Sequence, residues 1–394
     1  MAETWQNWSG SIKFTPQQIL EPETEEELAR EVAKAAEANK KVRVYGAGHS
    51  SMPLVETPDL LLSVNNMKGL ISYKEGEEAT IYAGMKVKEA GEALHKVSLG
   101  MHNTGDVDVQ NLSGAIGTGT HGTGMKLQNL SGMLLGAKLV TASGEIIEKH
   151  IEDDPEFIKA LRVSLGTFGI FTQLRVKAQP AYQLLRQEYC THVDTCLENL
   201  QELKTRNRNF DFYWYPRSDL AKLRTMNEPG QGMENLPFAE LVMRKEGWSH
   251  EVLARTRELK FDEMEYALPL DAGPECFQEV RRRIKKKHRA QVAWRVLYRT
   301  IAADDTYISP YFQRDSVTIS LHQNAGLPFW DYFKDIEPIF RAYGGRPHWA
   351  KKHTLKANDL RDMYPKWEDF LKFRQQMDPK GVFLTSYLKE LFGV

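Results

Sequence analysis

The sequence predicts an α+β protein of two domains. Its 394 residues are enough to form two hydrophobic cores. In residues 1–178, helix-like and strand-like hydrophobic periodicities alternate, and two glycine-rich loops interrupt them. After residue 180, an amphipathic stretch leads into a strand-like run of alternating aromatic residues. These three observations set the fold class and place a domain boundary near residue 178.

Composition and charge exclude several classes of protein. Lys and Arg number 52 against 53 Asp and Glu, so no net field attracts nucleic acid or a membrane surface. The three cysteines, Cys190, Cys196 and Cys276, are odd in number and lack C-x-x-C spacing, which indicates neither a disulfide framework nor a metal site. The N-terminus resembles no signal peptide, and no 18-residue apolar run occurs. We therefore expect a cytoplasmic monomer or small homo-oligomer without an integral membrane segment.

The first elements are readable from their end signals. Trp5 and Trp8 are interpreted as core anchors for the terminus. Thr24 and Glu27 form a capping box that starts a helix over residues 25–39. A short strand over residues 42–45 then runs into a glycine loop that presents a histidine. That loop reads Gly46-Ala47-Gly48-His49-Ser50-Ser51.

The rest of the first region alternates strands and helices. Strands are predicted over residues 60–64 and 79–83, followed by a helix over residues 87–97. Ser143-Gly144 predicts a hairpin between residues 135–140 and 146–148. A glycine-broken strand run covers residues 165–176.

The second glycine loop, GDVDVQNLSGAIGTGTHGTG at residues 105–124, indicates a phosphate-bearing ligand. Its six glycines free the backbone for close approach, and its hydroxyl residues and backbone N–H groups offer donors. The loop contains G-x-G-x-x-G, but the glycines that follow make the required helix improbable. It also lacks the G-K-[ST] ending of a Walker A loop. The sequence therefore predicts a dinucleotide held by loops.

Three motifs carry a family resemblance. VYGAGHSS, the 105–124 stretch and SLGTFGIFT occur in the order and at the separation of the flavin-binding domain of the VAO/PCMH superfamily. More narrowly, they resemble the sugar-1,4-lactone (gulonolactone, arabinonolactone) and alditol oxidases. The resemblance implies an FAD-binding domain of two α+β subdomains over residues 1–178. It also implies a substrate-binding cap domain with a mixed or antiparallel sheet flanked by helices over 179–345, and a segment over 346–394 that returns to the FAD domain.

The resemblance further implies FAD as cofactor, joined covalently through His49. A neutral imidazole is nucleophilic near neutral pH, which suits such a bond. His121 matches a motif histidine that is not the tether, and we interpret it as loop structure. The implied cofactor-binding residues are Gly46, Ala47, Gly48, His49, Ser50, Ser51, Asn111, Ser113, Gly114, Gly117, Thr118, Gly119, His121, Gly122 and Ile170.

The second region is less informative up to about residue 290. Residues 188–205 are amphipathic, and residues 210–215 alternate aromatics as in a strand on a half-buried surface. Residues 227–237 predict a loop or flap. The basic run over 281–289 could be a nucleic-acid or lipid patch, but it follows a helical stretch and lacks aromatics, so we interpret it as a solvated helix face.

The chemistry is expected between Trp294 and Lys351. Arg299 falls on the active-site arginine of the resembled oxidases, where it would stabilise reduced flavin; the alternative is an ion pair with Asp304 or Asp315. His322 matches a position that lines the substrate pocket. Lys351, in an HWxK motif, would draw off the substrate hydroxyl proton. The expected catalytic and substrate-binding residues are Asn111, Leu297, Arg299, His322 and Lys351.

One departure concerns Leu297, which stands where the resembled oxidases usually have a substrate-gripping glutamate. An apolar side chain cannot orient a polyol. We therefore expect weak activity on simple alditols or lactones, or a larger substrate with an apolar portion.

The resulting prediction is an FAD-dependent oxidoreductase that takes hydride from a carbinol of a sugar, alditol or aldono-1,4-lactone and passes electrons to O2, giving H2O2. One alternative is a dehydrogenase that uses a quinone, dye or cytochrome acceptor. Another is a flavin-binding protein whose catalytic pocket is impaired by Leu297. The expected partners are a small-molecule carbohydrate or polyol and O2, with no nucleic acid and no metal.

Overall fold

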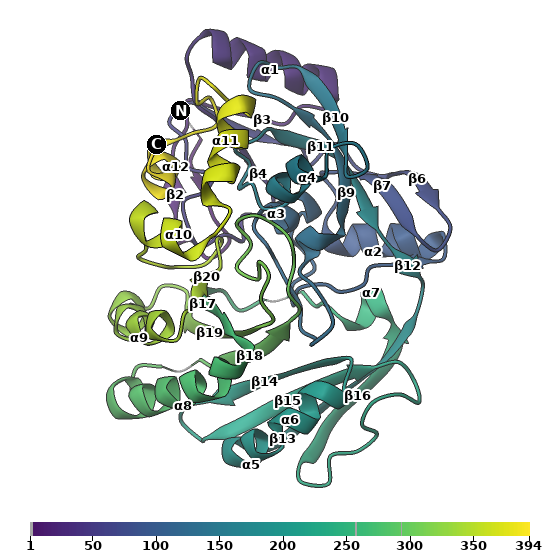
Figure 1. The fold of residues 1–394 in the computed structure, drawn as a ribbon, viewed down its shortest axis with the longest axis vertical. Helices are drawn as coiled ribbons and strands as arrows, with labels where there is room; N and C mark the ends of the chain where they lie inside the picture. The colour runs from purple at the N-terminus through teal and green to yellow at the C-terminus, as the bar shows by residue number, and fades with distance from the viewer. Residues whose placement is uncertain (1–2, 257, 293) are drawn as a thin grey trace.

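The computed structural model describes residues 3–256, 258–292 and 294–394. The α+β class is confirmed: Figure 1 shows helices and several separate sheets. The yellow C-terminal helices lie beside the purple N-terminal strands, so the two ends of the chain meet in one part of the molecule.

Two sheets and the helices packed against them build the N-terminal part. A parallel sheet has the order β3-β5-β4, and an antiparallel sheet has the order β10-β9-β11-β7-β6. Their bounds are β3 Gln18–Leu20, β4 Val42–Tyr45, β5 Leu60–Ser63, β6 Leu70–Lys74, β7 Glu78–Tyr82, β9 Leu134–Val140, β10 Ile146–His150 and β11 Ile170–Lys177. The predicted hairpin is confirmed as β9–β10, with Gly144 at φ +82° in its turn.

An antiparallel sheet of eight strands forms the second part, in the order β16-β13-β15-β14-β18-β19-β17-β20. Its strands are β13 Gln183–His192, β14 Asn209–Tyr215, β15 Leu220–Asn227, β16 Glu240–Trp248, β17 Phe261–Pro269, β18 Val296–Ile301, β19 Ser316–Asn324 and β20 Arg346–Pro347. Two-stranded pairs, β1 Trp5–Gln6 with β2 Lys13–Phe14 and β8 Leu99–Gly100 with β12 Gln179–Pro180, complete the sheets.

Helices cover one face of the eight-stranded sheet: α5 and α6 pack on β13–β15, α8 on β19 and α9 on β17. Phe212 and Tyr298 point to this face, where Phe212 meets Phe277 of α8 at 5.2 Å between ring centroids. Since side chains alternate along a strand, their neighbours point the other way, toward the N-terminal part. The half-buried surface predicted for residues 210–215 is therefore wrong, because β14 is covered on both faces and buried from Asn209 to Trp214.

The helices are α1 Glu25–Glu37, α2 Val87–Lys96, α3 Leu112–Gly117, α4 Pro155–Leu161, α5 Val193–Glu198, α6 Leu200–Arg206, α7 Ser249–Val252, α8 Gly273–Arg283, α9 Trp330–Ala342, α10 Ala357–Met363, α11 Trp367–Met377 and α12 Ser386–Phe392. The predicted first helix is confirmed as α1, whose Thr24 hydroxyl accepts from the Glu27 N–H. None of the helices in the described part of the chain is long and apolar enough to cross a membrane.

Three stretches differ from the expectation in detail. The 105–124 loop contains a short helix, α3. The amphipathic stretch at 188–205 begins within β13 and becomes helical only at Val193. The strand predicted over 165–176 starts at Ile170, because Leu165, Gly166 and Gly169 have positive φ values of 52°, 67° and 152°.

The basic run over 281–289 lies on the end of α8 and the turn of π-helix after it, Ile284–His288. Arg281 and Lys285 pair with Asp219, and Arg283 and Lys287 pair with Asp335. These contacts support a solvated, locally neutralised helix face.

The C-terminal segment joins the N-terminal part through buried hydrogen bonds. The Val42 N–H donates to the Val382 carbonyl at 2.9 Å. The buried Arg43 guanidinium donates to the carbonyls of Leu54, Gly166, Phe383 and Leu165 at 2.8, 2.9, 3.0 and 2.5 Å. These contacts support the division into residues 1–178, 179–345 and 346–394, which stays a prediction.

Replacing Arg43 with methionine should destabilise the protein by about 3 kcal/mol, because four buried carbonyls lose charged donors. The thermal unfolding midpoint measures this loss. Arg30→Met, which removes the same group from the exposed face of α1, is the control and should change the midpoint little. An equal midpoint for both variants would show that the hydrogen bonds of Arg43 do not stabilise the contact between the C-terminal segment and the N-terminal part.

Candidate active site

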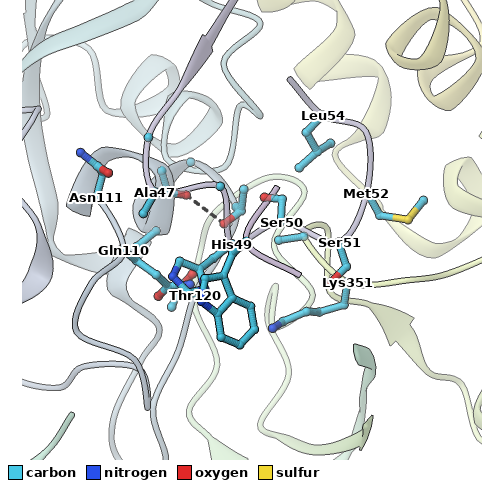
Figure 2. A pocket seen from close by; sticks show the side chains of 18 of the residues that line it. Ala47, His49, Ser50, Ser51, Met52, Leu54, Gln110, Asn111, Thr120 and Lys351 are labelled. Atoms are coloured by element: carbon cyan, nitrogen blue, oxygen red, sulfur yellow. Dashed lines mark hydrogen bonds between the residues drawn. The ribbon is translucent and has the colours of Figure 1, made fainter. Parts of the chain in front are cut away.

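One large cavity lies between the eight-stranded sheet and the N-terminal part. Its empty space, with the solvent at its open mouth included, is about 1840 Å³. Residues from both glycine loops, β17, β18, β19 and the HWxK segment line it. Figure 2 shows His49 and Lys351 reaching this pocket from distant parts of the chain.

The first glycine loop passes over the start of α3. A Cβ on Gly46 would lie 2.6 Å from Asn111 Oδ1, and Gly48 has φ +68°, so both positions require glycine. The Asn111 amide donates to Asn65 Oδ1 and to the Gly84 carbonyl, at 2.8 and 2.9 Å. Its own Oδ1 is buried without a hydrogen-bond partner in the described part of the chain. A ligand donor in the cavity would satisfy this oxygen.

The second loop leaves open space at its glycines. A Cβ added at Gly114 or Gly117 would meet no atom within 4 Å, and both residues line the cavity. Gly119 and Gly122 do not line it. Gly119 is required by its backbone, with φ +75°, and Gly122 by packing, because a Cβ there would lie 2.3 Å from the Thr104 carbonyl oxygen.

The hydroxyl groups of this loop are used differently from our expectation. Ser113 donates to the Ala83 carbonyl, Thr118 to the Gly114 carbonyl and Thr123 to the Phe210 carbonyl. Their protons are therefore committed to the backbone rather than to a phosphate. The remaining features, an unfilled glycine cradle and an unpartnered buried amide oxygen, fit the pyrophosphate and ring system of FAD.

His49 faces the cavity and packs on Trp8, with ring centroids 4.8 Å apart. Burial, together with the charges of Lys351 and Lys86, lowers the pKa of His49 to about 4. The imidazole is therefore neutral at neutral pH and makes no hydrogen bond with any described residue. Trp5 and Trp8 were interpreted as core anchors, but both line the cavity. The indole of Trp8 supports the histidine face.

Glu265 of β17 joins three side chains at the base of the cavity. Its carboxylate accepts from Arg299 Nη2 at 2.5 Å and from the Ser320 hydroxyl, and it lies 2.7 Å from His121 Nε2. Burial alone would raise the pKa of Glu265, but His121 and Arg299 hold it well below its usual range. Arg299 therefore has an ion-pair partner, and this partner is neither Asp304 nor Asp315.

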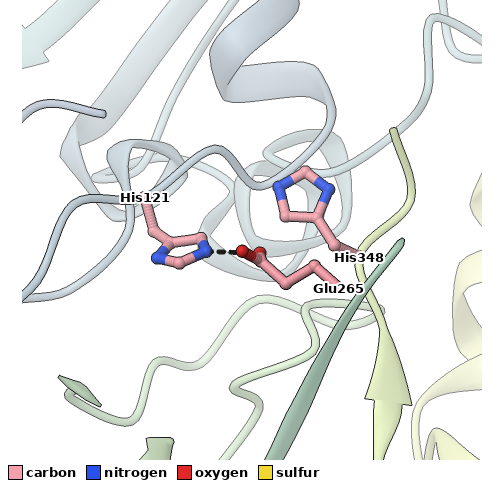
Figure 3. A group of neighbouring side chains, drawn as sticks. All are labelled: His121, Glu265 and His348. Carbon is pink, nitrogen blue, oxygen red and sulfur yellow. Dashed lines mark hydrogen bonds and ion pairs between the residues drawn. The ribbon is translucent and has the colours of Figure 1, made fainter. Parts of the chain in front are cut away.

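Both ring nitrogens of His121 are occupied, because Nδ1 donates to the Gly122 carbonyl at 2.8 Å. Figure 3 shows His121, Glu265 and His348 as neighbours. One possible ligand atom from each lies within 4.8 Å of the others, as in a metal site. The Arg299 guanidinium, however, lies 3.3 Å from His121 Nε2 and would repel a cation there. We interpret the group as a hydrogen-bond network.

Glu263, two residues earlier on β17, connects the other two predicted catalytic residues. Its carboxylate forms an ion pair with Lys351 Nζ and lies 3.3 Å from His322 Nε2. Burial would raise the pKa of Glu263, but Lys351 and His322 outweigh it and lower the pKa. The Ser51 N–H donates to the Ala350 carbonyl at 2.7 Å, which fixes the lysine segment against the first glycine loop.

The structure brings together all the predicted site residues except Gly119 and Gly122. The sequence reasoning missed several acidic and aromatic residues of the cavity wall, and one arginine. These are Trp8, Asp106, Tyr213, Phe261, Glu263, Glu265 and Arg295. The run DEMEYAL reads as an ordinary alternating strand, and only the structure shows that both faces of β17 are buried. A carboxylate on the covered face of such a strand requires a cationic partner.

Comparison with known proteins gives consistent results. Residues 16–149 match the family described as FAD binding domain, and residues 238–391 match the family described as D-arabinono-1,4-lactone oxidase. The chain is 32% identical to an L-gulono-1,4-lactone dehydrogenase of Mycobacterium tuberculosis over 100% of both chains. It is 28% identical to an L-gulonolactone oxidase of Mus musculus over 98% of each. A cholesterol oxidase from B. sterolicum shares the fold, with a TM-score of 0.88 at 17% identity over 100% of this chain and 97% of that one.

Glu263 should make stability depend on acid pH. A carboxyl group whose pKa is lowered by folding stabilises the protein above its unfolded pKa of about 4.3, and this stabilisation is lost as pH falls toward the folded value. At neutral pH, Glu263→Gln should cost about 3 kcal/mol by leaving Lys351 without its partner. The variant's unfolding midpoint should then fall less steeply than that of the wild type between about pH 5 and pH 3.

The control is Glu390→Gln, which removes an exposed carboxylate paired only with Lys356 at the surface. Its midpoint should follow the wild-type curve over the same pH range. A Glu263→Gln curve parallel to that of the wild type would show that the pKa of Glu263 is not lowered.

Proposed function

We propose that this protein oxidises a carbinol of a sugar lactone or related polyol in the cavity described above. The basis is that the chain belongs to the family of FAD-dependent aldonolactone oxidases and dehydrogenases. The observation that carries the proposal is the meeting of Arg299, His322 and Lys351 beside the glycine cradle in a single cavity. FAD bound there supplies the hydride acceptor.

We propose His49 as the covalent attachment point of the flavin. Its ring lines the cavity, is neutral at neutral pH and has no hydrogen bond to displace. The other cavity histidine of the glycine loops, His121, has both nitrogens engaged and is fully buried, so it cannot attack a ligand without breaking the Glu265 network. Steric access and protonation state both favour His49.

Lys351 and Arg299 are proposed to act on the substrate. The Lys351 ammonium, held by Glu263, gives one proton to that carboxylate, and the neutral amine so formed takes the proton of the substrate hydroxyl as hydride leaves carbon. Arg299, held by Glu265, presents positive charge to an oxygen of the substrate or to the flavin. His322 Nδ1 donates to the Arg295 carbonyl at 3.0 Å, which fixes its ring in the pocket wall.

These contacts argue against a pocket impaired by Leu297. The side chain of Leu297 is buried on the cavity face, but the paired register places Glu265 in the same row, two strands away through Ser320. Carboxylates therefore reach the cavity from β17 instead of β18. The geometry supports turnover rather than flavin binding alone.

Molecular oxygen is our proposed acceptor, with H2O2 as product. The alternative, a dehydrogenase that passes electrons to a quinone, dye or cytochrome, is kept because the M. tuberculosis relative carries a dehydrogenase name. The cytoplasmic location and the monomeric or small homo-oligomeric state stay predictions.

Lys351→Met should lower the rate of anaerobic flavin reduction by L-gulono-1,4-lactone by about 10²–10⁴-fold, because the hydroxyl proton loses its acceptor. Stopped-flow absorbance of the flavin measures the rate, and peroxide released on admission of air distinguishes oxidase from dehydrogenase. Lys372→Met on the exposed face of α11 is the matched control and should react at the wild-type rate. If no member of a panel of lactones and alditols reduces the wild-type flavin, the proposed function fails.

Acid precipitation should leave the yellow colour in the pellet of the wild-type protein and in the supernatant of His49→Ala. His121→Gln, which keeps a hydrogen-bonding side chain in the second loop, should retain the colour in the pellet. Colour retained by the pellet of His49→Ala would contradict the assignment of the tether.

A further inference from the structure

Arg295 is a cation in the cavity wall whose charge no described residue balances. Its side chain lines the cavity just before β18, and its buried Nε has no hydrogen-bond partner in the part of the chain that the structure describes. Among the residues that the structure describes, none forms a salt bridge with it. Arg299, by contrast, is neutralised by Glu265. A half-buried guanidinium in a cavity wall, with no counter-ion among the described residues, can pair with an anion that enters the cavity.

Aromatic rings hold the Arg295 guanidinium in one orientation. Its Cζ lies 4.1 Å from the ring centroid of Tyr213 and 5.5 Å from that of Trp294. The Arg295 carbonyl accepts from His322 Nδ1, which anchors the backbone as well. Stacking leaves the edge of the planar guanidinium free to donate. The group is therefore preorganised to bind an acceptor in the plane of its N–H groups.

The neighbouring carboxylates are already occupied. Asp106 accepts from the Tyr213 hydroxyl at 2.5 Å and from Arg224 at 2.9 Å, and Glu263 is held by Lys351 and His322. Within residues 3–256, 258–292 and 294–394, no carboxylate therefore forms a salt bridge with Arg295.

The apolar side chain of Leu297 explains why the Arg295 guanidinium has no carboxylate beside it on β18. Alternation along β18 puts positions 295, 297 and 299 on the same face, and all three side chains line the cavity. A glutamate at position 297 would stand between the two arginines and pair with them. The leucine leaves that space apolar and leaves Arg295 unmatched.

We propose that Arg295 binds a carboxylate group of the substrate, so that the preferred substrates are acidic sugars, such as uronic or aldonic acid derivatives, rather than only neutral lactones. A carboxylate matches the guanidinium edge by two parallel hydrogen bonds and balances its single charge. A phosphate, with a charge of about −1.5 to −2, would exceed it. This inference rests on the proposed function, because it assigns a substrate class to the same cavity.

Binding of D-glucuronate and of its neutral isostere D-glucuronamide to the flavin-loaded protein, measured by titration calorimetry, tests the inference without turnover. The wild type should bind the acid at least about tenfold more tightly than the amide, as expected for one charge-assisted pair. Arg295→Gln should bring the ratio close to one without changing the affinity for the amide. Arg282→Gln, which removes an exposed arginine from α8, should keep the wild-type ratio.

One further variant and one further ligand extend the binding measurement. Leu297→Glu should weaken acid binding, because the new carboxylate competes for Arg295. Glucose 6-phosphate should bind more weakly than glucuronate to the wild type. Tighter binding of the phosphate, or equal binding of acid and amide by the wild type, would overturn the inference, and the wild-type comparison holds even if Arg295→Gln fails to fold.

Failure of this inference is distinguishable from failure of the proposed function. If L-gulono-1,4-lactone reduces the flavin while acid and amide bind equally, only the carboxylate site is disproved. If no sugar reduces the flavin, the oxidoreductase function fails, and the calorimetric ratio still decides whether Arg295 binds carboxylates.

Discussion

The two buried carboxylates of β17 are the constraint on which the site depends. Glu263 holds Lys351 and His322, and Glu265 holds Arg299 and His121. A buried charge is tolerated only when it is paired and hydrogen-bonded, so each carboxylate fixes the position of its partners as firmly as they fix the carboxylate. The two carboxylates of β17 therefore hold side chains of β18, β19, the second glycine loop and the C-terminal lysine segment beside one another in the cavity wall.

Strand alternation gives the eight-stranded sheet its two roles. Phe212, Tyr298 and Tyr266 face the helices, where Tyr266 stacks on Phe340 at 5.2 Å. Their neighbours Tyr213 and Leu297 face the cavity. The helix-covered side provides the hydrophobic stability that offsets the cost of a charged, solvent-excluded side. A one-residue change of register in β17 would exchange the two sets and remove both carboxylates from the site.

The glycine loops were the part of the site most accessible to sequence reasoning. Glycines at positive φ and at close contacts have few substitutes, so GAGHSS and the 105–124 stretch stand out without any knowledge of the fold. The resemblance then supplied Arg299, His322 and Lys351. It did not supply Glu263 or Glu265, because DEMEYAL reads as an ordinary alternating strand and nothing in its spacing indicates partners 34 to 144 residues away.

The sequence by itself determined the α+β class, most element positions in the first 178 residues, the two glycine loops and a neutral histidine poised at one of them. These are local properties, set by periodicity, end signals and backbone freedom within a few residues. Only the tertiary structure decided which ion pair Arg299 makes, that Trp8 supports His49 and that Arg295 finds no counter-ion among the described residues. Such facts depend on which charges burial brings together, since the strength of an electrostatic contact follows distance and dielectric rather than separation along the chain.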